Sequence, residues 1–244
     1  MTDPKLSIVI ITLNEAKRLP LLLDDLKLQT FTGFEIIHVD SNSDDETVAI
    51  SRQYAADFNH YQTIEMTCQG VSLGRNTGAR AAKGKRLLFL DADTRLAPNF
   101  LMNSLRELDT HNSDVGIVLM SSKGLPWHHA LGYKAFNLGI RATTHFFPTA
   151  IGACLFSTPS VHEAIGGFDE NITLCEDCNY ALKAFKTHDA FLRVLSTRFL
   201  FDPRRLDQDG FLETGLVYLK ANLRRFFVGE MRNQEIAYPF GHYR

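Results

Sequence analysis

Short apolar runs alternate with helix-like segments over the first 120 residues, and this alternation constrains the fold more than any other feature. Runs typical of buried strands occupy residues 6–13, 34–39, 63–66, 86–90 and 115–120. The intervening segments carry apolar side chains at helical spacing, namely 15–29, 44–56, 71–82 and 98–108. Strands that alternate with helices predict an α/β fold in which a mostly parallel sheet is flanked by helices.

The alternation of strand-like and helix-like segments weakens after residue 120, because the apolar residues of 121–148 follow no regular spacing. A strand over 154–156, a helix over 176–186 and a strand over 191–195 are still predicted. No repeat, low-complexity tract or linker interrupts the chain, so we predict a single domain over residues 1–244. One helix start is also predicted, with Ser43 as the cap of helix 44–56 and Glu46 at the capping-box position.

Polar side chains follow the ends of three predicted strands. Parallel sheets bind ligands in the crevice at the carboxyl ends of their strands. Asp91 and Asp93 come directly after the apolar run 87–90, where the pair could share Mg²⁺ or Mn²⁺ with the oxygens of a diphosphate. Two solvated loop acids are the alternative reading of the same pattern.

The first two strand ends suggest a nucleoside site. Asp40 ends the second strand, where its carboxylate could accept a hydrogen bond from the imide of a uracil ring, or act only as a turn residue. Thr12, Asn14 and Glu15 follow the first strand and could hold base and ribose. Asn14 could equally cap the next helix.

Taken together, these segments resemble a family 2 glycosyltransferase, whose fold is of the GT-A type, and the resemblance spans about residues 6–210. The matching segments are residues 7–15, Asp40 with 43–47, Gly74-Arg75-Asn76-Thr77-Gly78, 89–93, Gly166-Gly167-Phe168-Asp169-Glu170 and Glu176-Asp177. The resemblance implies a donor half over residues 1–120 and an acceptor half with a C-terminal helix over residues 121–244.

The resemblance also implies roles for residues of the donor half. Thr12, Glu15 and Asp40 would contact the nucleoside. Arg75 would approach the diphosphate or nucleotide. Asp91 would lie near the ribose.

Metal and catalytic roles follow from the same resemblance. Asp93, with Asp91, would bind the Mn²⁺ or Mg²⁺ ion. Asp177, the second acid of the Glu176-Asp177 pair, would be the base of an inverting transfer. A helix N-terminus would lower the pKa of Asp177, whereas neighbouring acids would raise it, so the sequence leaves the balance open. Ordinary first-turn acids are the other interpretation of this pair.

The donor and acceptor are less clear than the reaction. The resemblance makes UDP the first expectation for the donor nucleotide, with GDP second, while sugar, lipid-carrier and small-molecule acceptors all stay open. Ser41-Asn42 follow Asp40 where the family often has an acid or a glycine, which puts the base contacts in doubt. The processive signature Gln-x-x-Arg-Trp is missing, since Trp127 is the sole tryptophan, so no polymerisation is expected.

An amphipathic, basic helix is predicted over the segment that begins at Phe211 and ends at Arg232. Its apolar stripe consists of Leu212, Leu216, Leu219, Leu223 and Phe226, and its basic residues are Lys220, Arg224, Arg225 and Arg232. Such a helix either lies on an anionic membrane surface or packs on the domain or on a second copy of a homo-oligomer. Arg204 and Arg205 precede it and either reach donor phosphates or are simply solvated.

The net charge and the number of cysteines limit which binding partners and which cellular compartment are expected. A net charge of −2 gives no support to a nucleic-acid partner. Four cysteines are too few for a disulfide scaffold, and Cys175 and Cys178 form a lone C-x-x-C whose role the sequence leaves open. Without a signal-like start or an apolar stretch of roughly 20 residues, we expect a cytoplasmic protein, either soluble or peripheral on the inner face of a membrane.

Three other functions compete with glycosyl transfer. A sugar-phosphate nucleotidyltransferase would share the sheet and the acids, but should carry a Gly-rich basic loop where Asn14 and Glu15 stand. A non-catalytic nucleotide-sugar-binding protein is disfavoured because every expected carboxylate is present. A dinucleotide-binding dehydrogenase lacks its G-x-G-x-x-G after the first strand.

Overall fold

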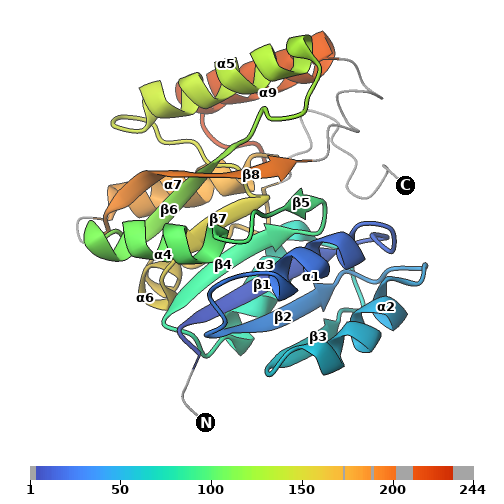
Figure 1. Cartoon of the computed structure of the whole chain (residues 1–244). Coiled ribbons are helices and arrows are strands. Elements are labelled where there is room, and N and C mark those ends of the chain that lie inside the picture. Colours follow the sequence, from blue (N-terminus) through green and yellow to red (C-terminus); the bar gives the residue numbers. More distant parts are fainter. Residues whose placement is uncertain (1–3, 173, 188–189, 202–210, 233–244) are drawn as a thin grey trace.

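The computed structural model describes residues 4–172, 174–187, 190–201 and 211–232, with the side chains of the last segment described from residue 216. Within these residues the chain forms one mixed sheet of eight strands in the order β3-β2-β1-β4-β7-β6-β8-β5. Helices cover the sheet, and the helices α5 and α9 form a further layer beyond it (Figure 1). The expected α/β class with a largely parallel sheet is confirmed, since four of the seven strand pairings are parallel.

The amino-terminal half forms the parallel part of the sheet. Its strands are β1 (Leu6–Thr12), β2 (Phe34–Asp40), β3 (Tyr61–Glu65) and β4 (Arg86–Asp91). The connections contain α1 (Leu19–Lys27), α2 (Thr47–Tyr54), the 3₁₀ turn η1 (Ala55–Asp57) and α3 (Val71–Ala81). The register sets Thr12 beside Asp40 and Ile11 beside Asp91, so the polar strand ends meet at one edge of the sheet.

The second half completes the sheet with antiparallel and parallel strands. In chain order it contains β5 (Thr94–Arg95), α4 (Phe100–Thr110), β6 (Val115–Met120), α5 (Trp127–Thr143), β7 (Cys154–Ser157), α6 (Pro159–Ala164), α7 (Glu176–Lys186), β8 (Leu192–Phe201) and α9 (Phe211–Phe227). Strand β7 runs antiparallel to both β4 and β6, and β8 returns parallel to β6. Because β7 lies beside β4, the segment before β7 reaches the site edge.

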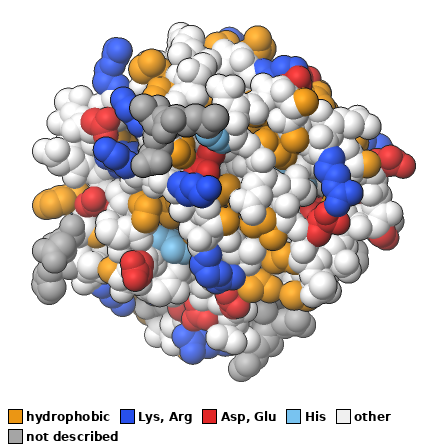
Figure 2. Space-filling model, turned by 90° about the horizontal axis from the view of Figure 1, so that it is seen from below, with side chains coloured by type: hydrophobic (Ala, Val, Ile, Leu, Met, Phe, Trp, Pro, Cys, Tyr) orange, Lys and Arg blue, Asp and Glu red, His pale blue; other side chains and the backbone are white. Residues whose placement is uncertain are grey.

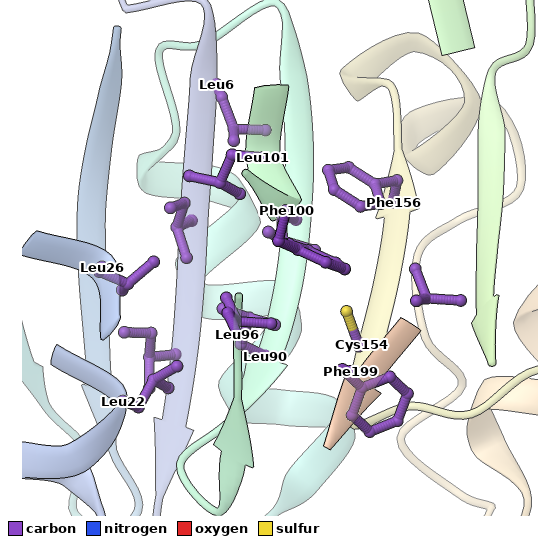
Figure 3. Packing of buried hydrophobic residues seen from close by; sticks show 14 of the residues in the cluster. Leu6, Leu22, Leu26, Leu90, Leu96, Phe100, Leu101, Cys154, Phe156 and Phe199 are labelled. Atoms are coloured by element: carbon purple, nitrogen blue, oxygen red, sulfur yellow. The ribbon is translucent and has the colours of Figure 1, made fainter. Parts of the chain in front are cut away.

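Two apolar clusters, one on each face of the sheet, form the core. On one face Leu90, Phe100 and Phe156 are buried together with residues of α1 and α4 (Figure 3). On the other, Phe89, Phe168 and Tyr180 pack with residues of α7. Continuous burial of β1, β4 and β7 explains why these strands read as unbroken apolar runs.

Several local predictions differ from the structure. Helices α5 and α6 lie where no helix was predicted. The predicted cap at Ser43 is wrong: α2 begins at Thr47, and the Ser43 hydroxyl donates to Asp40 instead. Asn14 does not cap α1, which begins five residues later at Leu19.

Candidate active site

Arg75 lies at the centre of the candidate site, on the buried face of α3. Only 2% of its side chain is exposed, and its Nη1 and Nη2 donate to Glu176 Oε1 at 2.7 Å and Asp91 Oδ1 at 2.9 Å. Burial opposes the charge on Arg75, but the carboxylates of Asp91, Glu176 and Asp177 outweigh it and raise the pKa of the guanidinium. One cation thus joins the end of β4 to the start of α7.

Asp177 is held beside this cation by backbone donors. Its Oδ2 accepts the Gly152 N–H at 2.6 Å, and its Oδ1 accepts the Cys178 N–H at 2.7 Å. Asp177 keeps some exposed surface, yet protein atoms enclose the carboxyl group closely, so desolvation is the largest influence on it. Burial and the charge of Glu176 raise the pKa of Asp177 to about 6, against the lowering effect of Arg75 and the backbone donors.

The backbone immediately before these acids is strained. Cys175, the residue that precedes α7, has φ +64°, a left-handed conformation that non-glycine residues rarely adopt. Such a conformation costs roughly 1–3 kcal/mol and persists only where surrounding structure enforces it. It directs Glu176 and Asp177 toward the cation at the start of the helix.

A buried aromatic platform supports Arg75. The guanidinium lies 5.1 Å from the ring centre of Phe168, and Phe168 stacks on Tyr180 with ring centres 4.4 Å apart. Asn76 fixes the Gly166–Phe168 turn, because it donates to the Phe168 carbonyl and accepts the Phe168 N–H, both at 2.9 Å. These bonds hold the turn in place, with its aromatic ring buried against the guanidinium.

Thr12 and Asp40 form a second network at the ends of β1 and β2. Thr12 Oγ1 donates to Asp40 Oδ1 at 2.9 Å and contacts His38 Nε2 at 2.8 Å. The Ser43 hydroxyl and N–H both donate to the Asp40 carboxylate, at 2.6 and 2.8 Å. Asp40 is only 2% exposed, and its hydrogen bonds join the end of β1 to the loop that follows β2.

Asn14 and Glu15 join the loops after β1 and β2 by other contacts. Asn14 adopts φ +59°, accepts the Asp44 N–H at 2.9 Å, and donates its own N–H to Ser43 Oγ at 2.9 Å. The Glu15 N–H donates to the Thr47 hydroxyl, while its carboxylate lies 3.5 Å from Arg18. Both residues line the edge at which the nucleoside contacts are predicted.

The Asp91/Asp93 pair suits a divalent cation as oxygen donors, but does not form a complete site alone. Within the described ranges, no three His, Cys, Asp or Glu side chains gather as a metal-binding group. Mg²⁺ and Mn²⁺ usually complete their shell with waters and substrate phosphates, so two carboxylates at a strand end fit such an ion. Asp91 and the half-buried Asp93 flank the short turn after β4.

The remaining predictions concern two arginines and two cysteines. Arg204 and Arg205 lie outside the described residues. Cys175 and Cys178 are both buried, form no disulfide, and pack against Ala221 of α9. Contact with the Cys175 thiol, followed by burial, raises the pKa of Cys178 well above its usual range, which is unfavourable for thiolate chemistry.

Gly152 and His38 are site residues that the sequence analysis did not name, and it gave no role to Asn76. A β-carbon on Gly152 would lie 2.7 Å from Arg75 Nη2, so this position accepts only a glycine without rearrangement. Glycine is the residue type that allows a close approach to the backbone, and this is the signal that could have identified Gly152. Asn76 is part of the Gly74–Gly78 motif, yet its partner Phe168 lies 92 residues away along the chain.

Within the described residues, no helix is long and apolar enough to cross a bilayer.

Comparison with solved structures confirms the GT-A fold. TarS residues 1–349 from Staphylococcus aureus, solved in complex with UDP-GlcNAc, matches with a TM-score of 0.64 at 22% identity, over 80% of this chain and 57% of that one. The mannosyltransferase PcManGT of Pyrobaculum calidifontis, in complex with GDP-Man and Mn²⁺, matches with a TM-score of 0.65 at 22% identity, over 80% and 56%.

Proteins that are similar in sequence are also named as glycosyltransferases. The poly(ribitol-phosphate) beta-N-acetylglucosaminyltransferase TarS of Staphylococcus aureus strain Mu50 is 31% identical over 189 residues, which cover 74% of this chain and 32% of the relative. A PGL/p-HBAD biosynthesis glycosyltransferase of Mycobacterium bovis strain BCG is 42% identical over 97 residues, which cover 39% and 38%. This chain thus spans about a third of the length of these curated relatives. The model of glycosyl transferase family 2 matches residues 7–161, more than half of the chain, and the protein therefore belongs to that family.

Proposed function

We propose that this protein transfers a sugar from a nucleotide-sugar donor to an acceptor hydroxyl with inversion at the anomeric carbon. The observation that carries the proposal is the convergence of Asp91, Glu176 and Asp177 around the buried Arg75. The edge of the sheet where parallel strands end is where such folds bind ligands. Relatives solved with UDP-GlcNAc and with GDP-Man and Mn²⁺ support a donor of this chemical class.

Asp177 is the general base of the proposed reaction. An inverting transfer is a single displacement, in which the base takes the acceptor proton as the acceptor oxygen attacks the anomeric carbon. The bond from that carbon to the diphosphate oxygen breaks on the opposite side. A pKa of about 6 leaves Asp177 ionised at neutral pH, and makes it a stronger base than an ordinary aspartate.

Arg75 and the backbone set the geometry for this base. Gly152 and Cys178 hold both Asp177 oxygens, which fixes the carboxylate before an acceptor arrives. Arg75 keeps Glu176 beside it and offsets part of the local negative charge. Asp91 and Asp93 would hold the divalent cation, which when bound would neutralise charge on the departing diphosphate. UDP is the first expectation for the nucleotide, with GDP second.

The central test separates donor binding from chemistry. The full chain is screened by thermal shift and calorimetry against UDP-GlcNAc, GDP-Man, UDP and GDP, each with and without Mn²⁺. We expect one nucleotide series to stabilise the protein, with a larger shift when Mn²⁺ is present. Asp93→Asn should weaken the Mn²⁺-dependent part of the shift. Flat responses throughout would contradict the proposal.

Asp177→Asn tests the base directly. A positioned base contributes roughly 10²–10⁴-fold, so transfer should fall by that factor while nucleotide affinity stays within about twofold. Asp57→Asn is the matched control. Asp57 is exposed and lies just before the start of β3, whereas the candidate site lies at the ends of the parallel strands. Equal loss of donor binding and transfer in Asp177→Asn would instead assign Asp177 a structural role.

A nucleotidyltransferase would give a different product. It would release pyrophosphate from a nucleoside triphosphate and a sugar phosphate, whereas the proposed enzyme releases a nucleoside diphosphate. A binding protein without catalysis would show the thermal shift but no turnover with any acceptor. Product analysis by mass spectrometry therefore distinguishes all three functions.

A further inference from the structure

Large apolar side chains on one face of α9 point into solvent. Their exposed fractions lie between 50% and 76%, far above those of core residues. The residues are Leu216, Leu219, Leu223, Phe226 and Phe227. An open apolar groove follows this face and includes Lys220 and Arg224 in its lining. Contiguous exposed apolar surface of this kind marks an interaction site rather than ordinary protein surface.

Contacts on the opposite face of α9 hold the helix in this orientation. Ala221 is fully buried against Cys175 and Cys178 at the start of α7. Arg225 is 3% exposed and makes two hydrogen bonds to Glu230, at 2.8 and 3.1 Å. Ala221 and Arg225 therefore face the domain, while Leu216, Leu219 and Leu223 face outward.

Helix α5 extends the exposed surface. It lies against α9, with the rings of Phe136 and Tyr218 6.0 Å apart between centres, and Phe147, which follows α5, lies 5.2 Å from the ring of Phe226. Figure 1 shows the two helices as one layer at the top of the molecule. Exposed apolar side chains of this part of the chain are Trp127, Leu131, Leu138 and Phe146. The two helices thus form one layer, which we call the α5–α9 surface.

Among the described side chains of the α5–α9 surface, the exposed charged groups are basic. Residues 121–148 contain no Asp or Glu, whereas Lys123, Lys134 and Arg141 are exposed. On α9, Lys220 is exposed as well, and Glu230 is engaged by Arg225. The opposite end of the molecule, seen in Figure 2, carries acidic and basic side chains interspersed. A second copy seated on this surface by a two-fold axis would bring like charges together.

We propose that the α5–α9 surface docks on an anionic lipid bilayer. Its leucines and phenylalanines would enter the boundary between headgroups and acyl chains, while its lysines and arginines would meet lipid phosphates. Trp127, the sole tryptophan, is 79% exposed at the start of α5, and tryptophan favours this interfacial depth. This inference goes beyond the proposed function and does not depend on donor turnover.

The test is co-sedimentation of the full chain with vesicles. Vesicles of phosphatidylcholine alone are compared with vesicles of equal parts phosphatidylcholine and phosphatidylglycerol. We expect binding to the anionic vesicles only, weakened by added salt. Leu219→Ser and Leu223→Ser should each reduce the partition coefficient about tenfold. Lys220→Glu should reduce it at least about fivefold, since each basic residue near such a surface adds about 1 kcal/mol.

Leu28→Ser is the matched control, because Leu28 is 66% exposed at the end of α1 and lies outside the α5–α9 surface. It should bind vesicles like the unmodified chain. Thermal unfolding verifies that every variant is folded, which is expected because all the substituted side chains are exposed. Failure to bind anionic vesicles would overturn the proposal, as would binding that the leucine variants leave unchanged. A dimer in light scattering that Leu219→Ser dissociates would assign the surface to a second copy and also overturn it.

Discussion

Gly152 and Arg75 approach so closely that a β-carbon on the glycine would lie 2.7 Å from Nη2 of the arginine. The same glycine donates its N–H to Asp177. One backbone position therefore sets the spacing between the buried cation and the proposed base. Because the segment before β7 lies next to the end of β4, this spacing depends on the antiparallel pairing of those two strands.

Substitution of this glycine should damage catalysis more than folding. Gly152→Ala forces the guanidinium or the 150–153 segment to move, and displacement of a catalytic group by about 1 Å can reduce turnover about 10²-fold. The strain should lower the free energy of unfolding by about 1–3 kcal/mol. Steady-state kinetics and urea denaturation measure the two effects. Gly139→Ala is the control, because nothing lies within 4 Å of its added carbon and α5 should be slightly stabilised.

The strand ends could be predicted from sequence because an unbroken apolar run that stops at an acid is typical of a buried parallel strand. This pattern places Asp40 and Asp91 at the correct edge of the sheet. Ser43 shows the limit of local patterns: a carboxylate on the preceding strand accepts from a hydroxyl that is suited to capping a helix. The pKa of Asp177 could not be predicted, since it depends on burial by residues distant along the chain.

Helix α5 was missed for a physical reason. Helical periodicity is visible only when the apolar residues keep to one face of a helix, whereas α5 exposes Leu131 and Leu138 and buries Tyr133 and Ile140. The stripe on α9 was predicted, but the sequence could not decide whether it faces the domain. That orientation is set by Arg225, whose partner Glu230 lies beyond the end of the helix.

Loss of the buried cation should destabilise the fold strongly. Arg75→Met leaves Asp91 and Glu176 without their shared partner, and removing one member of a buried ion pair costs about 3–5 kcal/mol. Arg75→Lys should recover only part of this loss, because an ammonium group lacks the planar fork that reaches both carboxylates. Urea denaturation measures both variants against Arg80→Met, whose side chain is exposed on the same helix. Equal stabilities for Arg75→Met and Arg80→Met would contradict this account.

The transfer rate should depend on pH with an acidic limb near 6. Asp177 must be ionised to accept the acceptor proton, so kcat/KM should fall tenfold per pH unit below its pKa of about 6. Glu176→Gln removes a negative charge that raises this pKa, and should therefore move the limb to lower pH. Glu163→Gln, on the exposed side of α6, should leave the limb in place. A limb that stays near 6 in Glu176→Gln would mean that another group sets it.

Acid should destabilise the protein through His38. Burial lowers the pKa of His38 to about 4, despite the opposing charge of Asp40, so the folded protein holds this ring neutral. The pKa of His38 is lower in the folded protein than the unfolded value of 6.5. The contribution of the neutral ring to the free energy of unfolding is therefore fully present above pH 6.5 and is lost as pH falls toward 4. The shift corresponds to about 3 kcal/mol, as an order of magnitude. Burial lowers the pKa of His162 to about 4 as well, so a second ring acts in the same direction.

His38→Gln isolates the first contribution. A glutamine amide can still donate to Thr12 Oγ1, which accepts from the ring when Nε2 carries the proton and itself donates to Asp40. Urea denaturation at several pH values between 4 and 7 should therefore give a shallower loss of stability in His38→Gln than in the unmodified chain. His111→Gln, which replaces an exposed histidine, should keep the original slope. Parallel slopes for all three proteins would show that the ring of His38 gains its proton without opening the Thr12–Asp40 network.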